Sequence, residues 1–184
     1  MKPLKTLSRR TILDHGPRLK VEDHEVELPD GRVVKDWPWV ITRDYVIVLA
    51  MTAEGGFILF RQPKYAIEGL SLAPVGGYIE SGEEPLESAR RELVEETGYQ
   101  AGRWTALGAF RVDGNHGAGT AHLFLASEAA KVQEPDSDDV EEQEMLFLTP
   151  EEAKSALLAG QFKVLAWSAV MALALLKLET PDHR

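Results

Sequence analysis

The sequence predicts a layered α/β or α+β domain in which strands outnumber helices. Short runs rich in β-branched residues, separated by Gly, Asp and Pro, recur along most of the chain. Only three segments have the length and periodicity of helices, at 85–97, 150–159 and 162–178. A series of parallel βαβ units would need more helices than this, so we predict a mixed arrangement, with one domain or one domain plus a small appendage.

The first strands are predicted to form two hairpins. Residues 17–35 alternate valines with polar residues around Pro29-Asp30-Gly31, which favours a tight turn. Residues 44–52 and 56–62 are strand-like runs joined by a glycine-containing turn. The candidate domain boundary lies near residues 36–40. We therefore expect an N-terminal β-hairpin extension at 1–38 and a main domain at 39–184.

The remaining elements follow from local signals. Residues 70–80 predict a short strand broken by a proline and two glycines. Glu84 suits an N-cap, Pro85 the first helical position and Gly98 the residue after the helix. Strands are predicted at 104–112, 120–129 and 144–150, with an acidic loop between the last two.

Composition excludes several classes of function. The 184-residue chain has a formal net charge of -10, which repels nucleic-acid backbones, so polymeric nucleic acid is not an expected partner. It has no cysteine, which excludes disulfides, thiolate nucleophiles and cysteine zinc sites. The N-terminus lacks the apolar run of a secretory signal, and the apolar segment 164–176 is too short to span a bilayer. We expect a soluble, cytoplasmic protein that does not enter a membrane.

The helix predicted at 85–97 concentrates negative charge on one side. At about 100° per residue, Glu92, Glu95 and Glu96 fall within about 100° of one another. They lie beside the apolar stripe, which consists of Leu86, Ala89, Leu93 and Thr97. Charge at this end opposes the helix dipole, and Glu92 and Glu96 repel each other. A solvated face with Glu–Arg pairs is one interpretation, and a site for hard divalent cations is the other.

The spacing around this helix carries a family signature. Gly77 is followed after five residues by Glu83 and after seven more by Arg91-Glu92-Leu93-x-Glu95-Glu96-x-Gly98-Tyr99. This pattern resembles the Nudix box, G-x5-E-x7-R-E-U-x-E-E-x-G-U, where U is apolar. Every fixed position matches, and Tyr99 is a partly polar last member. The resemblance implies a Nudix-type α/β/α sandwich with a mixed sheet, on which the box forms a loop–helix–loop.

The resemblance also implies a chemistry, because Nudix enzymes hydrolyse a nucleoside diphosphate linked to another moiety. Glu92, Glu95 and Glu96 would hold Mg²⁺ or Mn²⁺ against the pyrophosphate, with Glu83 as a further ligand or as a brace for the loop. Arg91 would orient these carboxylates by ion pairing. The cations would neutralise phosphate oxygens and lower the pKa of an attacking water. Gly77 and Gly98 would allow tight turns at the two ends of the box.

The chain outside the box resembles the ADP-ribose pyrophosphatase-like branch of the family. The shared features are the N-terminal hairpin, the stretch RQPKY at 61–65 and the acidic loop before residue 144. In that branch the N-terminal strands exchange between two subunits, so a homodimer is expected. A nucleoside diphosphate sugar such as ADP-ribose would be the substrate, and Arg61 would contact its phosphate or ribose unless it is an ordinary surface arginine.

The same branch supplies a glutamate from a loop after the box, which binds metal or activates the water. Here the candidates are Glu141 and Glu142, followed by Asp138 and Asp139, and we prefer Glu141. A solvated acidic loop is the alternative. A general base must reach the water directly, which the sequence does not show.

One stretch departs from the branch. No proline lies between Tyr99 and Ala130, where the branch carries one, and a glycine-rich loop occupies residues 110–124. Arg111 and Asn115 in this loop would read a sugar or base, or else belong to a flexible turn. Together with Arg61 and Gly77 they form our candidate substrate-binding set.

Two tryptophans and two other functions remain as alternatives. Trp37 and Trp39 would stack on a base or, more simply, pack in the core or at a dimer contact. A nucleoside triphosphate pyrophosphatase is one alternative function, although minimal enzymes of that kind usually lack the N-terminal hairpin. A non-catalytic Nudix nucleotide-binding module is the other, but the full set of box glutamates argues against it.

Overall fold

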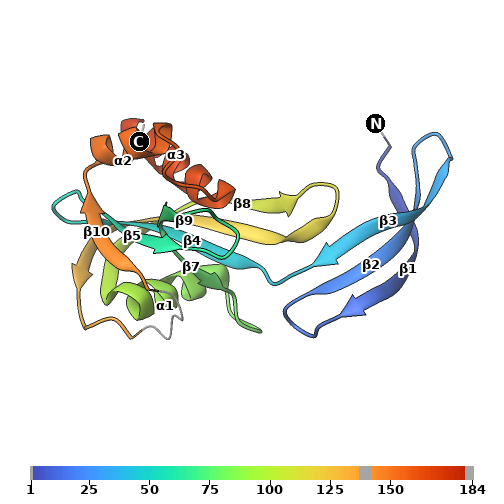
Figure 1. The fold of residues 1–184 in the computed structure, drawn as a ribbon, viewed down its shortest axis with the longest axis horizontal. Helices are drawn as coiled ribbons and strands as arrows, with labels where there is room; N and C mark the ends of the chain where they lie inside the picture. The colour runs from blue at the N-terminus through green and yellow to red at the C-terminus, as the bar shows by residue number, and fades with distance from the viewer. Residues whose placement is uncertain (1, 137–141, 181–184) are drawn as a thin grey trace. The chain divides into compact units, whose positions relative to one another are not determined.

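The computed structural model describes residues 2–136 and 142–180 (Figure 1). The chain forms two compact units, which are described separately. One unit comprises Met1–Asp44 with Phe110–Ala121, and the other comprises Tyr45–Ala109 with His122–Arg184. The predicted division into residues 1–38 and 39–184 stays a prediction.

The first unit is built on an antiparallel sheet of β1 (Lys5–Asp14), β2 (Lys20–Glu27) and β3 (Val33–Ile41). The hairpin predicted at 17–35 is confirmed, and its turn places Gly31 in the left-handed region at φ 86°. The structure adds a strand that the sequence did not predict, because every residue of β1 is exposed. Cross-strand pairs hold β1 on β2, among them the 2.8 Å ion pair between Arg10 and Asp23.

The tip of a long hairpin completes this unit. Strands β8 (Tyr99–Asp113) and β9 (Gly117–Lys131) pair with each other, and Val40 of β3 pairs in parallel with Gly117. The indole Nε1 of Trp37 donates to the carbonyl of Asn115 at 2.7 Å. Trp39 stacks on the buried ring of His24, with centroids 5.3 Å apart. Trp39 therefore packs within the unit, and Trp37 is attached there by a hydrogen bond, while stacking of either ring on a base stays a prediction.

The second unit is organised around two central strands. β4 (Tyr45–Thr52) and β5 (Phe57–Pro63) form the second predicted hairpin, which is confirmed. β7 (Val75–Tyr78) pairs with β4, while β6 (Leu70–Ala73) and β10 (Glu144–Leu148) pair with β5, all antiparallel. β9 lies beside β4 in the strand order.

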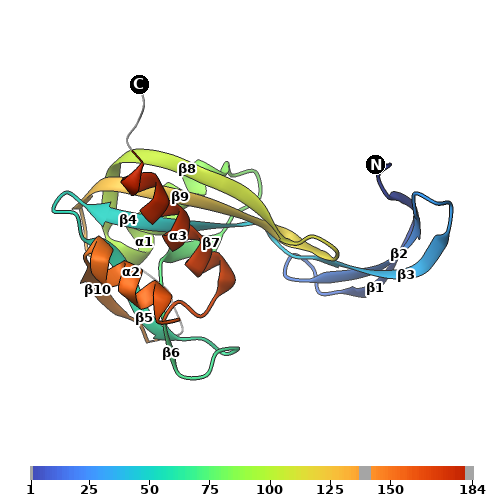
Figure 2. The ribbon, with the colours of Figure 1, turned by 90° about the horizontal axis from the view of Figure 1, so that it is seen from above.

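Helices cover both faces of this sheet, which makes the predicted α/β/α sandwich. Figure 1 shows α1 (Pro85–Thr97) on one face and α2 (Pro150–Leu158) and α3 (Leu165–Glu179) on the other. Figure 2, seen from above, shows α2 and α3 lying across the strands. Fully buried side chains from all three layers meet in the core, including Leu49, Phe57, Leu59, Leu93, Val170 and Met171. No helix within the described residues is long and apolar enough to cross a membrane.

Candidate active site

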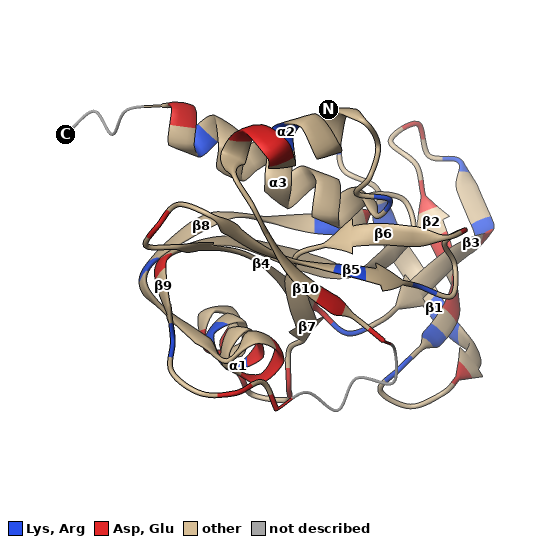
Figure 3. Cartoon of the chain, turned by 60° about the vertical axis from the view of Figure 1, so that its left-hand side comes forward, with Lys and Arg blue, Asp and Glu red and all other residues tan. Residues whose placement is uncertain are grey.

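Helix α1 forms as its local sequence predicts. Pro85 occupies the first turn after an extended Glu84, and Gly98 ends the helix in the left-handed conformation at φ 74°. The Gly98 N–H donates to the carbonyl of Val94 at 2.8 Å. Ala89 and Leu93 are fully buried against the sheet. The carboxylates beside this stripe therefore lie at the margin of the packed face, and Figure 3 shows the acidic residues gathered along α1.

Arg91 brings the predicted acidic residues together. Its Nε and Nη2 donate to the two oxygens of Glu83, each at 3.0 Å. Its Nη1 donates to Glu92 at 2.8 Å and to Glu95 at 3.0 Å. One guanidinium therefore contacts three of the four box glutamates, in the bidentate geometry that arginine favours with Glu83. Glu96 is half-buried on the next position of the same helix.

The charges of this cluster shift the pKa values of its members in opposite directions. The Arg91 hydrogen bonds lower the pKa of Glu83 to about 2, and the same carboxylate raises the pKa of Arg91. Burial raises the pKa of Glu92, whose side chain is only 12% exposed, although Arg91 opposes this effect. Glu92 is therefore the member whose charge gains most from a further cation, because Arg91 only partly offsets its burial.

Gly77 lies inside strand β7, so the tight turn predicted there is wrong. A Cβ at this position would overlap the Glu92 carboxyl group, touching its carbon and both oxygens. The residue is therefore needed for space and not for backbone conformation. This packing could not be predicted from the sequence, because the contact joins a strand to a helix residue fifteen positions further along the chain.

The carboxylates have the chemistry of a divalent-cation site. Within the described residues, no three acidic or histidine side chains converge as ready-made ligands, since Glu83, Glu92 and Glu95 are turned onto Arg91. The described hydrogen bonds of Glu92 and Glu95 use one oxygen each, which leaves the second oxygen of each for a cation. Hard oxygen donors of this kind match Mg²⁺ or Mn²⁺.

The acidic loop after β9 begins on the end of α1. Val132 N and Gln133 N donate to the carbonyl of Gly98, and Asp136 N donates to the carbonyl of Glu95 at 2.8 Å. These bonds satisfy carbonyls that a helix end leaves without partners. Among the candidates that follow, Asp138, Asp139 and Glu141 lie outside the described residues. Glu142 lines a cleft of about 490 Å³ together with Arg61.

Arg61 is held by its neighbour strand. Its Nη1 donates to Glu144 at 2.9 Å, and the two residues are register partners on β5 and β10. Both side chains are about half exposed or more. A role for Arg61 in substrate binding stays a prediction, because this ion pair is also what a surface arginine makes.

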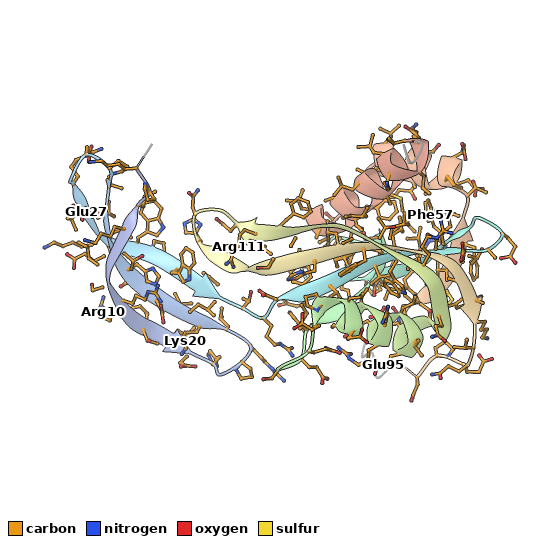
Figure 4. The ribbon with its side chains drawn as sticks, turned by 180° about the vertical axis from the view of Figure 1, so that it is seen from behind. Arg10, Lys20, Glu27, Phe57, Glu95 and Arg111 are labelled. Carbon is orange, nitrogen blue, oxygen red and sulfur yellow. The ribbon has the colours of Figure 1, made fainter. Side chains whose placement is uncertain are left out.

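Arg111 and Asn115 belong to the other compact unit. Arg111 lies near the end of β8 (Figure 4), and Asn115 lies in the turn between β8 and β9. Both are exposed. The carboxylate of Asp113 contacts the His116 ring at 3.0 Å and accepts from the backbone N–H groups of Asn115 and His116, and these contacts lower the pKa of Asp113 to about 2. These bonds define an ordered turn, and the substrate roles of Arg111 and Asn115 stay predictions.

An aromatic pocket next to β7 was missed in the sequence. Tyr45, Tyr78 and Trp167 line a hollow of about 230 Å³ between β4, β7 and the start of α3. The only sequence signal is Tyr78 directly after two glycines, which does not show that Trp167 lies opposite.

Comparison with known proteins assigns the class. The model of the NUDIX domain family matches residues 41–168, so the chain belongs to the Nudix family and is a Nudix hydrolase. A solved structure titled "Crystal structure of ADP compounds hydrolase" superposes with a TM-score of 0.81, covering 97% of this chain and 96% of that chain at 20% identity. That likeness confirms the predicted fold.

The relatives in sequence define the branch. The chain is 35% identical over 150 residues to "ADP-ribose pyrophosphatase" of Bacillus subtilis (strain 168), covering 81% of this chain and 80% of the relative. It is 30% identical over 150 residues to "Methanol dehydrogenase activator" of Bacillus methanolicus, with the same coverage. The predicted place in the ADP-ribose pyrophosphatase-like branch is thereby confirmed.

Proposed function

We propose that this Nudix hydrolase cleaves the pyrophosphate bond of a nucleoside diphosphate sugar such as ADP-ribose, with Mg²⁺ or Mn²⁺ as cofactor. The observation that carries the proposal is the set of box carboxylates gathered around Arg91 at the margin of α1. The substrate class rests on the relative from Bacillus subtilis, which is named for ADP-ribose.

Each residue of the cluster has a proposed role. Glu92, Glu95 and Glu96 would hold the cation, which would neutralise phosphate oxygens and lower the pKa of a bound water. Arg91 is a positioning residue, because its hydrogen bonds hold one oxygen of Glu92 and one oxygen of Glu95. The second oxygen of each carboxylate is left for the cation. Glu83 anchors the far side of the guanidinium and also accepts from the backbone N–H of Glu80, which braces the loop before α1.

Glu141 is our proposed general base. After β9 the chain contacts the end of α1 at Asp136, whose N–H donates to the Glu95 carbonyl, and it enters β10 at Glu144. Residue 141 therefore follows within five positions of a segment fixed next to a proposed cation ligand. Glu141→Gln should lower kcat while leaving binding of the cation unchanged, and equal loss of both would assign Glu141 to the metal instead.

The substrate proposal is tested by turnover of a panel in Mg²⁺ and in EDTA. The panel contains ADP-ribose, GDP-mannose, NADH, dinucleoside polyphosphates and deoxynucleoside triphosphates. We expect Mg²⁺-dependent release of a nucleoside monophosphate from ADP-ribose. Preference for the triphosphates would support the sanitising alternative, and no turnover of any compound would support the non-catalytic binding module.

The metal assignment is tested by substitution in α1. Glu95→Gln and Glu96→Gln should each lower kcat by orders of magnitude, because they remove a charged ligand without touching the buried stripe. Glu87→Gln is the matched control, since Glu87 lies in the first turn of the same helix, is 61% exposed and pairs only with Arg90 among the described residues. Wild-type activity in both test variants would refute the assignment.

We also propose that the chain is a homodimer that uses its N-terminal sheet. Within the described residues β1 pairs only with β2, so it presents an open edge, and exposed apolar side chains lie on this sheet at Leu4, Leu7, Ile12, Leu13, Val33 and Ile41. Deleting residues 1–36 should give a monomer by light scattering, and a truncated chain that stays dimeric would contradict the proposal.

A cytoplasmic location stays a prediction. The exclusion of polymeric nucleic acid as a partner, which rests on the net charge of -10, also stays a prediction.

A further inference from the structure

The aromatic pocket lies between two strands and the start of a helix. Tyr45 and Ile47 come from β4, Tyr78 from β7, and Val164, Ala166 and Trp167 from the beginning of α3. None of the lining residues carries a charge at neutral pH. The volume of about 230 Å³ is below the range of about 300–1,000 Å³ that holds a whole drug-sized ligand. The pocket therefore has the size of one ring system, and it offers no charged side chain to a phosphate.

Strand register explains why the walls converge. Tyr45 pairs with Tyr78, and Ile47 pairs with Gly76, so these positions share one face of the sheet. Gly76 contributes no side chain there, and Ile47 already leans over it, because a Cβ at Gly76 would meet the Ile47 Cδ1 atom. Tyr78 is 52% exposed at the rim, whereas Trp167 is 9% exposed, so the pocket is open on one side and closed on the other.

The same strand connects this pocket to the carboxylates. Gly77, between Gly76 and Tyr78, is directed to the opposite face, where a Cβ would overlap Glu92. The carbonyl of Tyr78 accepts from Arg91 Nη2 at 3.3 Å. The pocket and the proposed cation site therefore both contact β7, one on each side of this strand.

We propose that the aromatic pocket binds the purine base of the substrate, an inference that rests on the proposed pyrophosphate hydrolysis. Bases stack on aromatic side chains, and loss of such a contact typically weakens binding by about 5- to 150-fold. Tyr45 supplies a polar group beside the ring. Burial raises its pKa, so its phenol stays protonated and can donate a hydrogen bond to a ring nitrogen.

Adenosine tests this inference, because it carries the base and no phosphate. Its binding to the full-length, metal-free chain is measured by saturation-transfer NMR and equilibrium dialysis, with ribose 5-phosphate as the base-free probe. Ala166→Phe places a ring in the pocket and should weaken adenosine binding at least 10-fold. Ala169→Phe is the matched control, since Ala169 is a half-buried alanine of the same helix that does not line the pocket. It should bind adenosine as wild type does.

A second variant guards against misfolding. Tyr78→Ala removes the exposed rim ring but keeps the carbonyl that contacts Arg91, and it should weaken adenosine binding at least fivefold. Ribose 5-phosphate binding should be equal in all variants. Folded Ala166→Phe and Tyr78→Ala chains that bind adenosine as wild type does, or a wild type that binds none, would overturn the inference.

The outcomes separate this inference from the proposed function. A wild type that binds adenosine and loses it in Ala166→Phe supports the pocket even if no compound of the panel is hydrolysed. Hydrolysis of ADP-ribose with an unchanged KM in Ala166→Phe would retain the proposed function and reject the pocket.

Discussion

The substitution Gly77→Ala tests how closely β7 controls the proposed cation site. The new Cβ would overlap the Glu92 carboxyl carbon and both its oxygens. Non-bonded carbon atoms rest about 3.5–4.0 Å apart, so the carboxylate must retreat by more than about 1 Å. Movement of the strand is opposed by its pairing with β4, in which Val46 and Gly77 are register partners.

The consequence for activity follows from that displacement. A retreat of this size breaks the 2.8 Å hydrogen bond between Arg91 and Glu92 and moves a proposed cation ligand. A misplacement of about 1 Å costs on the order of 10²-fold in rate, which is about 2.7 kcal/mol of activation free energy. We expect kcat to fall about 100-fold while KM changes little, because no contact with the rest of the substrate is removed.

The assay compares kcat at saturating Mg²⁺ with the preferred substrate of the panel, alongside the melting temperature. Gly114→Ala is the control, because a Cβ there meets nothing within 4 Å and the backbone is not left-handed. A Gly77→Ala enzyme within threefold of wild type would refute the argument that Gly77 makes room for Glu92. A melting temperature lowered by more than 10 °C would show that the strand had yielded after all.

Three further predictions concern α1 and the residues that flank it. Arg91→Lys keeps the positive charge but loses the two-point contact with Glu83. We expect kcat to fall at least 10-fold, and cation binding is measured in parallel. Full activity would contradict the positioning role of Arg91. The pKa of Glu83 is about 2 in the folded chain and 4.5 ordinarily. The ionised Glu83 carboxylate therefore stabilises the fold by on the order of 1 kcal/mol after solvent screening. This contribution is present above pH 4.5 and is lost as the pH falls toward 2. In urea unfolding between pH 6 and 2, the free energy of unfolding of Glu83→Gln should change less with pH than that of the wild type. An identical pH dependence in the two proteins would exclude the effect. Gly98→Ala should destabilise the chain more than Gly160→Ala, because both backbones are left-handed but only at Gly98 would a Cβ strike a backbone carbonyl, that of Gln133. Equal losses in thermal denaturation would mean that this carbonyl moves aside.

Local signals predicted the fold where elements are bounded by their own residues. Pro85 and Gly98 define α1 without reference to any partner, and the two predicted hairpins are closed by glycine turns. Strand β1 lacks such signals, because its residues are exposed and it exists through pairing with β2. The ion pair between Arg10 and Asp23 spans thirteen positions, and no periodicity in the sequence shows its register.

The residues of the site fall into the same two groups, those indicated by local sequence signals and those that depend on contacts between distant elements. The acidic residues were predicted because their spacing is confined to one helix and the loop before it, and the structure brings Glu83, Glu92 and Glu95 onto Arg91. The space at Gly77 was not predicted, since it depends on a side chain from another layer. The aromatic pocket was missed for the same reason, because its walls come from β4, β7 and α3.

Arg91 has a consequence for the carboxylates of the site when no cation is bound. By supplying a positive charge to Glu83, Glu92 and Glu95, it relieves the repulsion that these carboxylates would otherwise exert on one another. We therefore expect these carboxylates to keep their positions when no ion is bound. A cation held by the second oxygens of Glu92 and Glu95 would share these two carboxylates with the guanidinium, so their negative charge would be compensated both when the ion is bound and after it leaves.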